Sequence, residues 1–192
     1  MDASVLVVGT TLIVALALVG VAVYGLRRRS DAKAGDGAVV ERLDERLAQT
    51  HDETRTHLEH PPRVRSLAVV GEMNSHPSHV PVIRVDLGTT DAPGPDIVFE
   101  YVASVLEAVH PLLASEGVLV HHYDVQFSFG PGGLLVSSEC RRVAVPLELV
   151  DQLVSDDRYR PHDLRRDVTA GDDGDDATAP VAWGECVTYD DS

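Results

Sequence analysis

The pattern of apolar and polar residues opens with one long apolar run. Ser4 to Leu26 contain no charged side chain, and Arg27, Arg28 and Arg29 follow directly. As a helix rising about 1.5 Å per residue, the run is roughly 35 Å long, enough to cross a hydrocarbon core of about 30 Å. It is longer than the roughly 7–15 apolar residues of a signal peptide, and no basic residue precedes it. We therefore expect residues 1–29 to be an uncleaved transmembrane anchor with a basic stop.

The basic residues beside this run also predict its orientation. Arg27, Arg28, Arg29 and Lys33 all lie after the run, and none lies before it. Lysine and arginine accumulate on the cytoplasmic side of a membrane span. We expect a single-pass protein in the cell membrane, with the N-terminus outside and the C-terminal domain cytoplasmic. An extracytoplasmic domain that handles lipid or metal would require the opposite topology.

A short polar linker, residues 30–37, leads into a segment with helical periodicity. Within residues 38–60, Val40, Leu43 and Leu47 recur near the helical spacing, with charged residues between them. The apolar seam fades after Leu47, which fits a coiled coil less well than a single amphipathic helix. Pro61 and Pro62 would end the helix. We expect a juxtamembrane helix that packs on its own domain or on the membrane surface.

The next part of the chain alternates between two periodicities. Residues 81–87, 118–129 and 134–145 have the period of two that half-buried strands require, whereas 97–115 and 147–154 have the period of a helix. Asp96 is a candidate N-cap for the first of these helices, and Pro111 should kink or interrupt it. Residues 63–70 could be a strand or a helix, and 71–80 read as a loop.

These elements predict an α+β fold. A small antiparallel sheet in β-α-β-β-α order, covered by helices, would occupy residues 61–166. Residues 167–192 are acidic, with no Lys or Arg after Arg166, and we expect them to form a disordered tail. Trp183, Val187 and Tyr189 interrupt this tail and could dock on a partner or on the domain itself.

Composition narrows the possible partners. Asp and Glu number 31 against 16 Lys and Arg, which gives a formal charge of −15, and the only lysine is Lys33. This balance resembles that of small membrane-anchored proteins of halophilic archaea, in composition only and without pointing to a family. Dense carboxylates keep a surface hydrated in concentrated salt. Nucleic acid is not an expected partner, because phosphate binding requires clustered basic residues.

The candidate chemistry is sparse. Cys140 and Cys186 are too few for a disulfide scaffold, and we expect reduced thiols in a cytoplasmic domain. His76 and His79 could offer two imidazoles to a metal, but the sequence indicates no third ligand nearby. Cys140 would resemble a nucleophile with its base only if the fold brought His121 beside it. We therefore expect no metal and no cofactor.

The predicted strand 118–129 supplies the remaining candidates. His121 and His122 are adjacent and should point to opposite faces, with His121 on the apolar face beside Tyr123. His122 and Asp124 would share a solvated outer face, and could form an acid/base pair there. Cys140, Leu134 and Val136 of the partner strand should face the aromatic core.

No convergent catalytic set emerges from these residues. We expect a non-enzymatic domain at the membrane that binds another protein or itself. The alternative is a membrane-associated enzyme or small-ligand sensor that uses the outer face of the 118–145 hairpin. Its candidate residues are His122, Asp124, Arg141 and Arg142.

Overall fold

The computed structural model describes residues 36–51, 58, 60–73, 75–130, 138–175 and 178–189. The predicted anchor, its basic stop and most of the linker lie outside these residues, as do Leu134 and Val136. Residues 39–192 group into one compact unit. The description below concerns that unit.

The fold is α+β, as the sequence predicts, but its sheet is mixed. Five strands lie in the order β1-β2-β3-β4-β5, and every neighbouring pair is antiparallel except β2 and β3. The expected antiparallel arrangement is wrong at this pair because α2 carries the chain back across the sheet, so both strands run the same way. The strands are β1 (Arg63–Met73), β2 (His76–Asp86), β3 (His122–Phe129), β4 (Glu139–Pro146) and β5 (Val181–Glu185).

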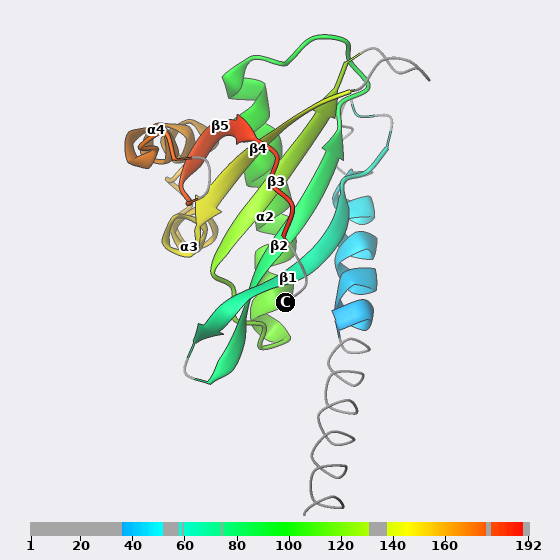
Figure 1. Ribbon diagram of the computed structural model, residues 1–192, viewed down its shortest axis with the longest axis vertical. Helices are drawn as coiled ribbons and strands as arrows, with labels where there is room; N and C mark the ends of the chain where they lie inside the picture. The colour runs from blue at the N-terminus through cyan, green and yellow to red at the C-terminus, as the bar shows by residue number, and fades with distance from the viewer. Residues whose placement is uncertain are drawn as a thin grey trace, which may run out of the picture. The chain divides into compact units, whose positions relative to one another are not determined.

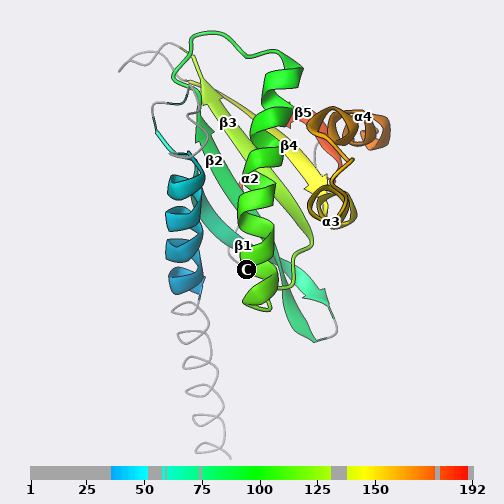
Figure 2. The same cartoon turned by 180° about the vertical axis from the view of Figure 1, so that it is seen from behind.

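Helices cover one face of this sheet (Figures 1 and 2). They are a helix over residues 36–51, α2 (Pro95–Ser115), α3 (Leu147–Ser155) and α4 (Pro161–Gly171). Among the described residues, α2 is long and apolar enough to cross a membrane. Val102, Leu106 and Val109 of α2 are nonetheless buried in the core formed with the sheet. The same composition is therefore explained by a core helix.

The hairpin of β1 and β2 decides one open prediction and contradicts another. Residues 63–70 are part of strand β1, which settles the choice between strand and helix. The predicted loop at 71–80 is wrong, because β1 continues to Met73 and β2 begins at His76. A tight turn at Ser75, with φ of 64°, takes the place of the loop. A turn this short carries no Pro-Gly signal that would separate it from a longer loop.

The predicted details of α2 are also corrected. Gly94, and not Asp96, is its N-cap, and Asp96 lies in the first turn, where a carboxylate still opposes the helix dipole. Asp96 Oδ1 accepts from Arg165 Nη1 at 2.6 Å, which joins α2 to α4. Pro111 lies inside the helix without interrupting it, because α2 continues to Ser115.

The predicted disorder of residues 167–192 is wrong where the structure describes them. Helix α4 continues to Gly171, and Val181–Glu185 form β5 at the edge of the sheet. Val168 and Val181 are fully buried, and the Trp183 ring packs on Phe127 and Phe129. The Asp-rich stretch between α4 and β5 is a surface connection, in which Asp172 Oδ2 accepts from Ala182 N. The carboxylates of Asp173 and Asp175 are exposed, while a few apolar residues hold the segment in place.

The helix of residues 36–51 belongs to the same folded unit. Leu43 and Leu47 are buried in the core with residues of α2 and β1. Asp44 Oδ1 accepts from the backbone N–H of Val64 at 2.7 Å, and Arg42 pairs with Glu116 at 2.8 Å. The amphipathic helix expected here therefore packs on its own domain, which starts before the predicted boundary at residue 61.

Truncating Leu43 tests this packing. Leu43→Ala should lower the free energy of unfolding by about 2–5 kcal/mol, because the side chain is fully buried. The exposed neighbour Glu45 is the control, and Glu45→Ala should change stability by less than about 0.5 kcal/mol. Denaturant titration at molar salt measures both. Equal effects would mean that the helix does not belong to the core.

Candidate functional site

The face of the sheet opposite the helices carries a row of polar side chains from β3. His122, Asp124, Gln126 and Ser128 occupy alternate positions and therefore share this face. All four are buried, with Asp124 fully inaccessible. The expected solvated outer face is wrong because the segment after β5, residues 186–189, crosses over β4 and β3 on this side (Figure 1).

A disulfide fixes the start of this segment. Cys140 of β4 is bonded to Cys186, with Cα atoms 5.6 Å apart, so the prediction of reduced thiols is wrong. Cys140 pairs with Ser128 in the ladder and thus lies on the polar face, not on the aromatic face as predicted. The predicted register is wrong because it assumes a short turn after β3, with strand pairing that begins at Leu134. In the structure the pairing begins at Glu139, opposite Phe129.

The centre of the polar face is a buried ion pair. Arg142 Nη1 lies 3.3 Å from Asp124 Oδ2, and both side chains are fully inaccessible. Gln126 Nε2 donates to the same oxygen at 3.4 Å. Removing two charges from water costs several kcal/mol per ion, and only good geometry and further hydrogen bonds offset that cost. The neighbours of this pair are therefore part of what keeps it folded.

Tyr189 supplies the most central of these neighbours. Its hydroxyl lies 3.1 Å from His122 Nε2 and 3.2 Å from Arg142 Nη1, and it is hydrogen-bonded to the Asp124 carboxylate. A phenol has one proton and two lone pairs. It therefore donates to Asp124 and accepts from Arg142 and from His122 Nε2. The tyrosine completes the network by matching each partner with the right hydrogen-bonding role.

This assignment also fixes the two histidines. Neutral His122 carries its proton on Nε2, which donates to the Tyr189 hydroxyl. Its Nδ1 therefore accepts a hydrogen bond from Nδ1 of His121, 2.8 Å away. The prediction that the adjacent imidazoles point to opposite faces is wrong, because His121 precedes the strand and is exposed. It is not the core histidine that the alternation predicts.

The environment keeps His122 neutral. Burial, together with nearby His121 and Arg142, lowers its pKa to about 4. A lowered pKa in the folded state means that folding excludes a proton. The contribution of His122 to stability is complete above its ordinary pKa of about 6.5 and is lost as the pH falls toward 4.

The same environment argues against a nucleophile in this cluster. Burial raises the pKa of Asp124, and the pKa of Tyr189 is raised by burial and by the Asp124 carboxylate. An activated nucleophile needs a lowered pKa or an accessible base beside it. The arrangement holds a charge pair and a phenol in place but activates neither as a nucleophile.

A second polar chain lies on the helix side. The Tyr123 hydroxyl of β3 is hydrogen-bonded to His110 Nδ1 at 2.8 Å, and His110 Nε2 lies 3.1 Å from Asp151 of α3. The order resembles a nucleophile, base and acid. Tyr123, however, is fully buried and burial raises its pKa, so the chain satisfies a core phenol and links β3, α2 and α3.

The remaining candidates do not converge. Arg141 pairs with Phe127 in the ladder and so lies on the helix face, away from Arg142. His76 and His79 stand three residues apart in β2 and therefore point to opposite faces. Within the described residues, no group of three or more His, Cys, Asp and Glu could hold a metal ion. Cys140 is bonded to Cys186 and pairs at the opposite end of β3 from His121.

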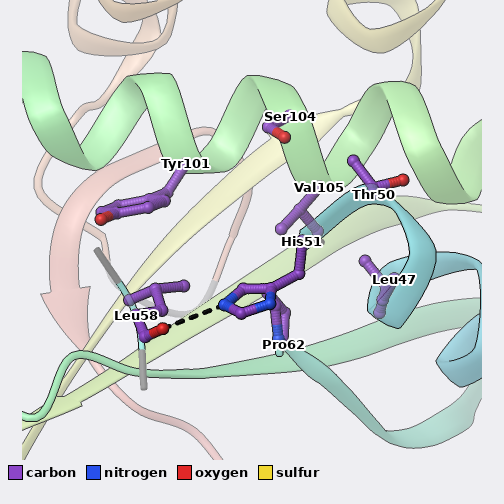
Figure 3. Close-up of a pocket in the computed structure, with 8 residues that line it drawn as sticks. All are labelled: Leu47, Thr50, His51, Leu58, Pro62, Tyr101, Ser104 and Val105. Carbon is purple, nitrogen blue, oxygen red and sulfur yellow. Dashed lines mark hydrogen bonds between the residues drawn. The ribbon is translucent and has the colours of Figure 1, made fainter. Parts of the chain in front are cut away.

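A small pocket lies between the helix of residues 36–51 and α2 (Figure 3). Its cavity volume of about 20 Å³ is far below the range of roughly 300–1,000 Å³ for small-molecule sites. His51 is the most polar group drawn there, and its Nε2 is bonded to the carbonyl of Leu58 at 3.0 Å. The other residues lining it are Leu47, Thr50, Pro62, Tyr101, Ser104 and Val105. Among the described residues that line it, no set of polar groups converges.

Comparison with protein families, curated proteins and solved structures found no match to this chain.

Sequence reasoning found His122, Asp124 and Arg142 but missed Tyr189 as their partner. The signal was present in two separate places. Polar residues alternate along β3, and aromatic residues interrupt the acidic C-terminal stretch. Joining these observations would have predicted that the stretch docks on the domain.

Breaking the ion pair from one side tests this network. Arg142→Ala should lower the free energy of unfolding by about 3–5 kcal/mol, because it leaves the Asp124 carboxylate buried without its counter-charge. The adjacent Arg141 serves as the control, and Arg141→Ala should cost less than about 1 kcal/mol. Thermal and denaturant unfolding measure the two variants. Similar losses would show that Arg142 contributes no more than the half-buried Arg141.

Proposed function

We propose that this protein is a membrane-tethered, non-enzymatic module that binds another protein or a second copy of itself. The end of the β1–β2 hairpin carries this proposal. Val69, Val70 and Met73 are each about two-fifths exposed, and the hairpin end projects past the other strands (Figure 1). Exposed apolar side chains gathered at one place commonly belong to an interaction surface.

The backbone of β1 adds to this surface. β1 is at the end of the strand order, so one side of it has no strand neighbour among the described residues. Asp44 of the preceding helix caps the amide of Val64 near its start. No such contact is found for 69–73 in the described part of the chain. An edge strand of this kind can accept an additional strand from a partner.

The alternative of an enzyme or small-ligand sensor draws on the His122, Asp124 and Arg142 cluster. These side chains do converge, which favours it. They are buried beneath residues 186–189, however, and the pKa shifts oppose nucleophilic chemistry. We rank the interaction module above the enzyme for that reason.

The membrane anchor and the side of the membrane on which the domain lies are parts of the same proposal. The uncharged run Ser4–Leu26 would anchor the chain, and Arg27–Arg29 would keep the domain in the cytoplasm. The acidic, lysine-poor composition would suit a halophilic cytoplasm. One observation opposes a cytoplasmic domain, since disulfides are rare in that compartment unless they are transient.

Charged residues at the hairpin end should abolish binding. Val70→Glu together with Met73→Glu should lower crosslinking to a stoichiometric partner, or self-association, by at least about tenfold, which corresponds to about 1.4 kcal/mol. The experiment uses the full-length protein in its own membranes at molar salt, with mass spectrometry of the crosslinked products.

The control places the same charge on a different exposed apolar residue. Val154 of α3 is 39% exposed, and Val154→Glu should leave the crosslinks unchanged. Circular dichroism confirms that both variants fold. Unchanged crosslinks in the hairpin variant would contradict the proposed surface, and a monomer without partners would contradict the interaction module.

Protease protection tests the proposed side of the membrane. Protease added to intact cells should leave the domain uncut, and opening the membrane should expose it. Cleavage in intact cells would reverse the topology, and would make the Cys140–Cys186 bond an ordinary disulfide of an oxidising compartment.

A further inference from the structure

The segment Cys186–Tyr189, here called the strap, lies on the sheet as a peptide ligand would. It follows β5 directly, and the Cys140–Cys186 bond holds its first residue where it leaves the sheet edge. The strap then crosses the face of the sheet opposite the helices (Figure 1). Thr188 is exposed, whereas Val187 and Tyr189 on either side are partly buried.

The face recognises both the backbone and a side chain of the strap. Gln126 Nε2 donates to the carbonyl of Val187 at 3.1 Å. The hydroxyl of Tyr189 meets His122 Nε2 and Arg142 Nη1. A fixed amide for a backbone carbonyl and a charged cluster for a phenol are the elements of a peptide site.

The strap does not satisfy everything that the face offers. Asp124 Oδ1 is buried and accepts no hydrogen bond among the described residues. A buried acceptor without a donor costs roughly 1–3 kcal/mol. A segment that adds a donor beside the tyrosine would therefore bind better than the strap does.

The strap is attached in a way that can be reversed. Cys140 and Cys186 are both partly exposed, so a reductant can reach the bond. No other covalent link holds the strap beyond β5. Cytoplasmic disulfides are usually transient or redox-sensing, so this bond is compatible with the cytoplasmic domain proposed above.

We propose that the strap is an intramolecular ligand released by reduction of Cys140–Cys186, and that the face it covers then binds an extended, tyrosine-bearing segment of another protein. This proposal deepens the proposed interaction function and rests on it, but uses a different face from the hairpin. The reductant is a dithiol. One of its thiolates attacks a sulfur of the bond, and its second thiol resolves the mixed disulfide. Two electrons and two protons pass to Cys140 and Cys186, and the dithiol becomes a disulfide.

The test measures peptide binding to the full chain in both redox states. The probe is a fluorescent peptide with the sequence of residues 182–189 and serine in place of cysteine. A tethered strap competes at an effective concentration in the millimolar range, so the chain carries Tyr189→Ala to weaken it. The peptide should bind the chain reduced by dithiothreitol at least about tenfold more tightly than the oxidised chain.

Two controls define the chemistry. A peptide with Tyr189→Phe lacks the hydroxyl and should lose most of this affinity. A chain with Cys140→Ser added to Tyr189→Ala should bind the peptide without reductant. The unsubstituted chain is also reduced, and hydrogen exchange of its residues 186–189 is measured. This measurement reports release of the strap even if a variant folds poorly.

Each result supports or overturns the proposal. Equal binding in both redox states, or continued protection of the strap after reduction, would show that the segment is purely structural. Dimers of the reduced chain that the peptide does not dissociate would overturn the assignment to another protein. Hairpin variants Val70→Glu/Met73→Glu should keep peptide binding, so failure of the strap proposal and failure of the hairpin proposal are distinguishable.

Discussion

The buried pair of Asp124 and Arg142 is the constraint on which the sheet face opposite the helices depends. Both side chains are fully removed from water in the centre of β3 and β4, so every neighbouring group must offset their desolvation. Gln126 and Tyr189 do so by hydrogen bonds to the pair, and His122 is hydrogen-bonded to the Tyr189 hydroxyl. The segment that carries Tyr189 is thus held by electrostatics as well as by the disulfide, and the acidic C-terminus acquires structure where composition alone predicts none.

The sequence predicts those elements whose residues are close together in the chain. Alternation identifies β2 and β3, and the helical period identifies α2 and α3. It does not distinguish a buried polar face from a solvated one, because both have the same period of two. The pattern therefore predicts a solvated face for His122 and Asp124, which are buried. The covering segment lies more than 60 residues further along the chain, and nothing local to β3 reports its presence.

The tail was mispredicted for a related physical reason. A low average hydrophobicity predicts disorder, since such a segment buries too little apolar surface to offset its ordering entropy. Here a few residues suffice, because Trp183 packs on Phe127 and Phe129 while Val181 is fully buried. Asp173 and Asp175, between α4 and β5, keep their carboxylates in water, at little cost to folding. Average composition does not separate the few apolar residues from the carboxylates around them. Burial depends on which individual side chains contact the core.

Under the proposed membrane tether, the disulfide and the basic residues after the apolar run favour opposite sides only if the bond is permanent. A bond that is partly exposed and closes the strap over polar groups can instead follow the redox state of its compartment. Its reduction would remove one of the two restraints on the strap and leave the Tyr189 network as the other. That network competes with any incoming tyrosine, so release would be graded by the partner's own chemistry. On this account the buried charge pair sets the specificity of the face and the disulfide sets when the face is available.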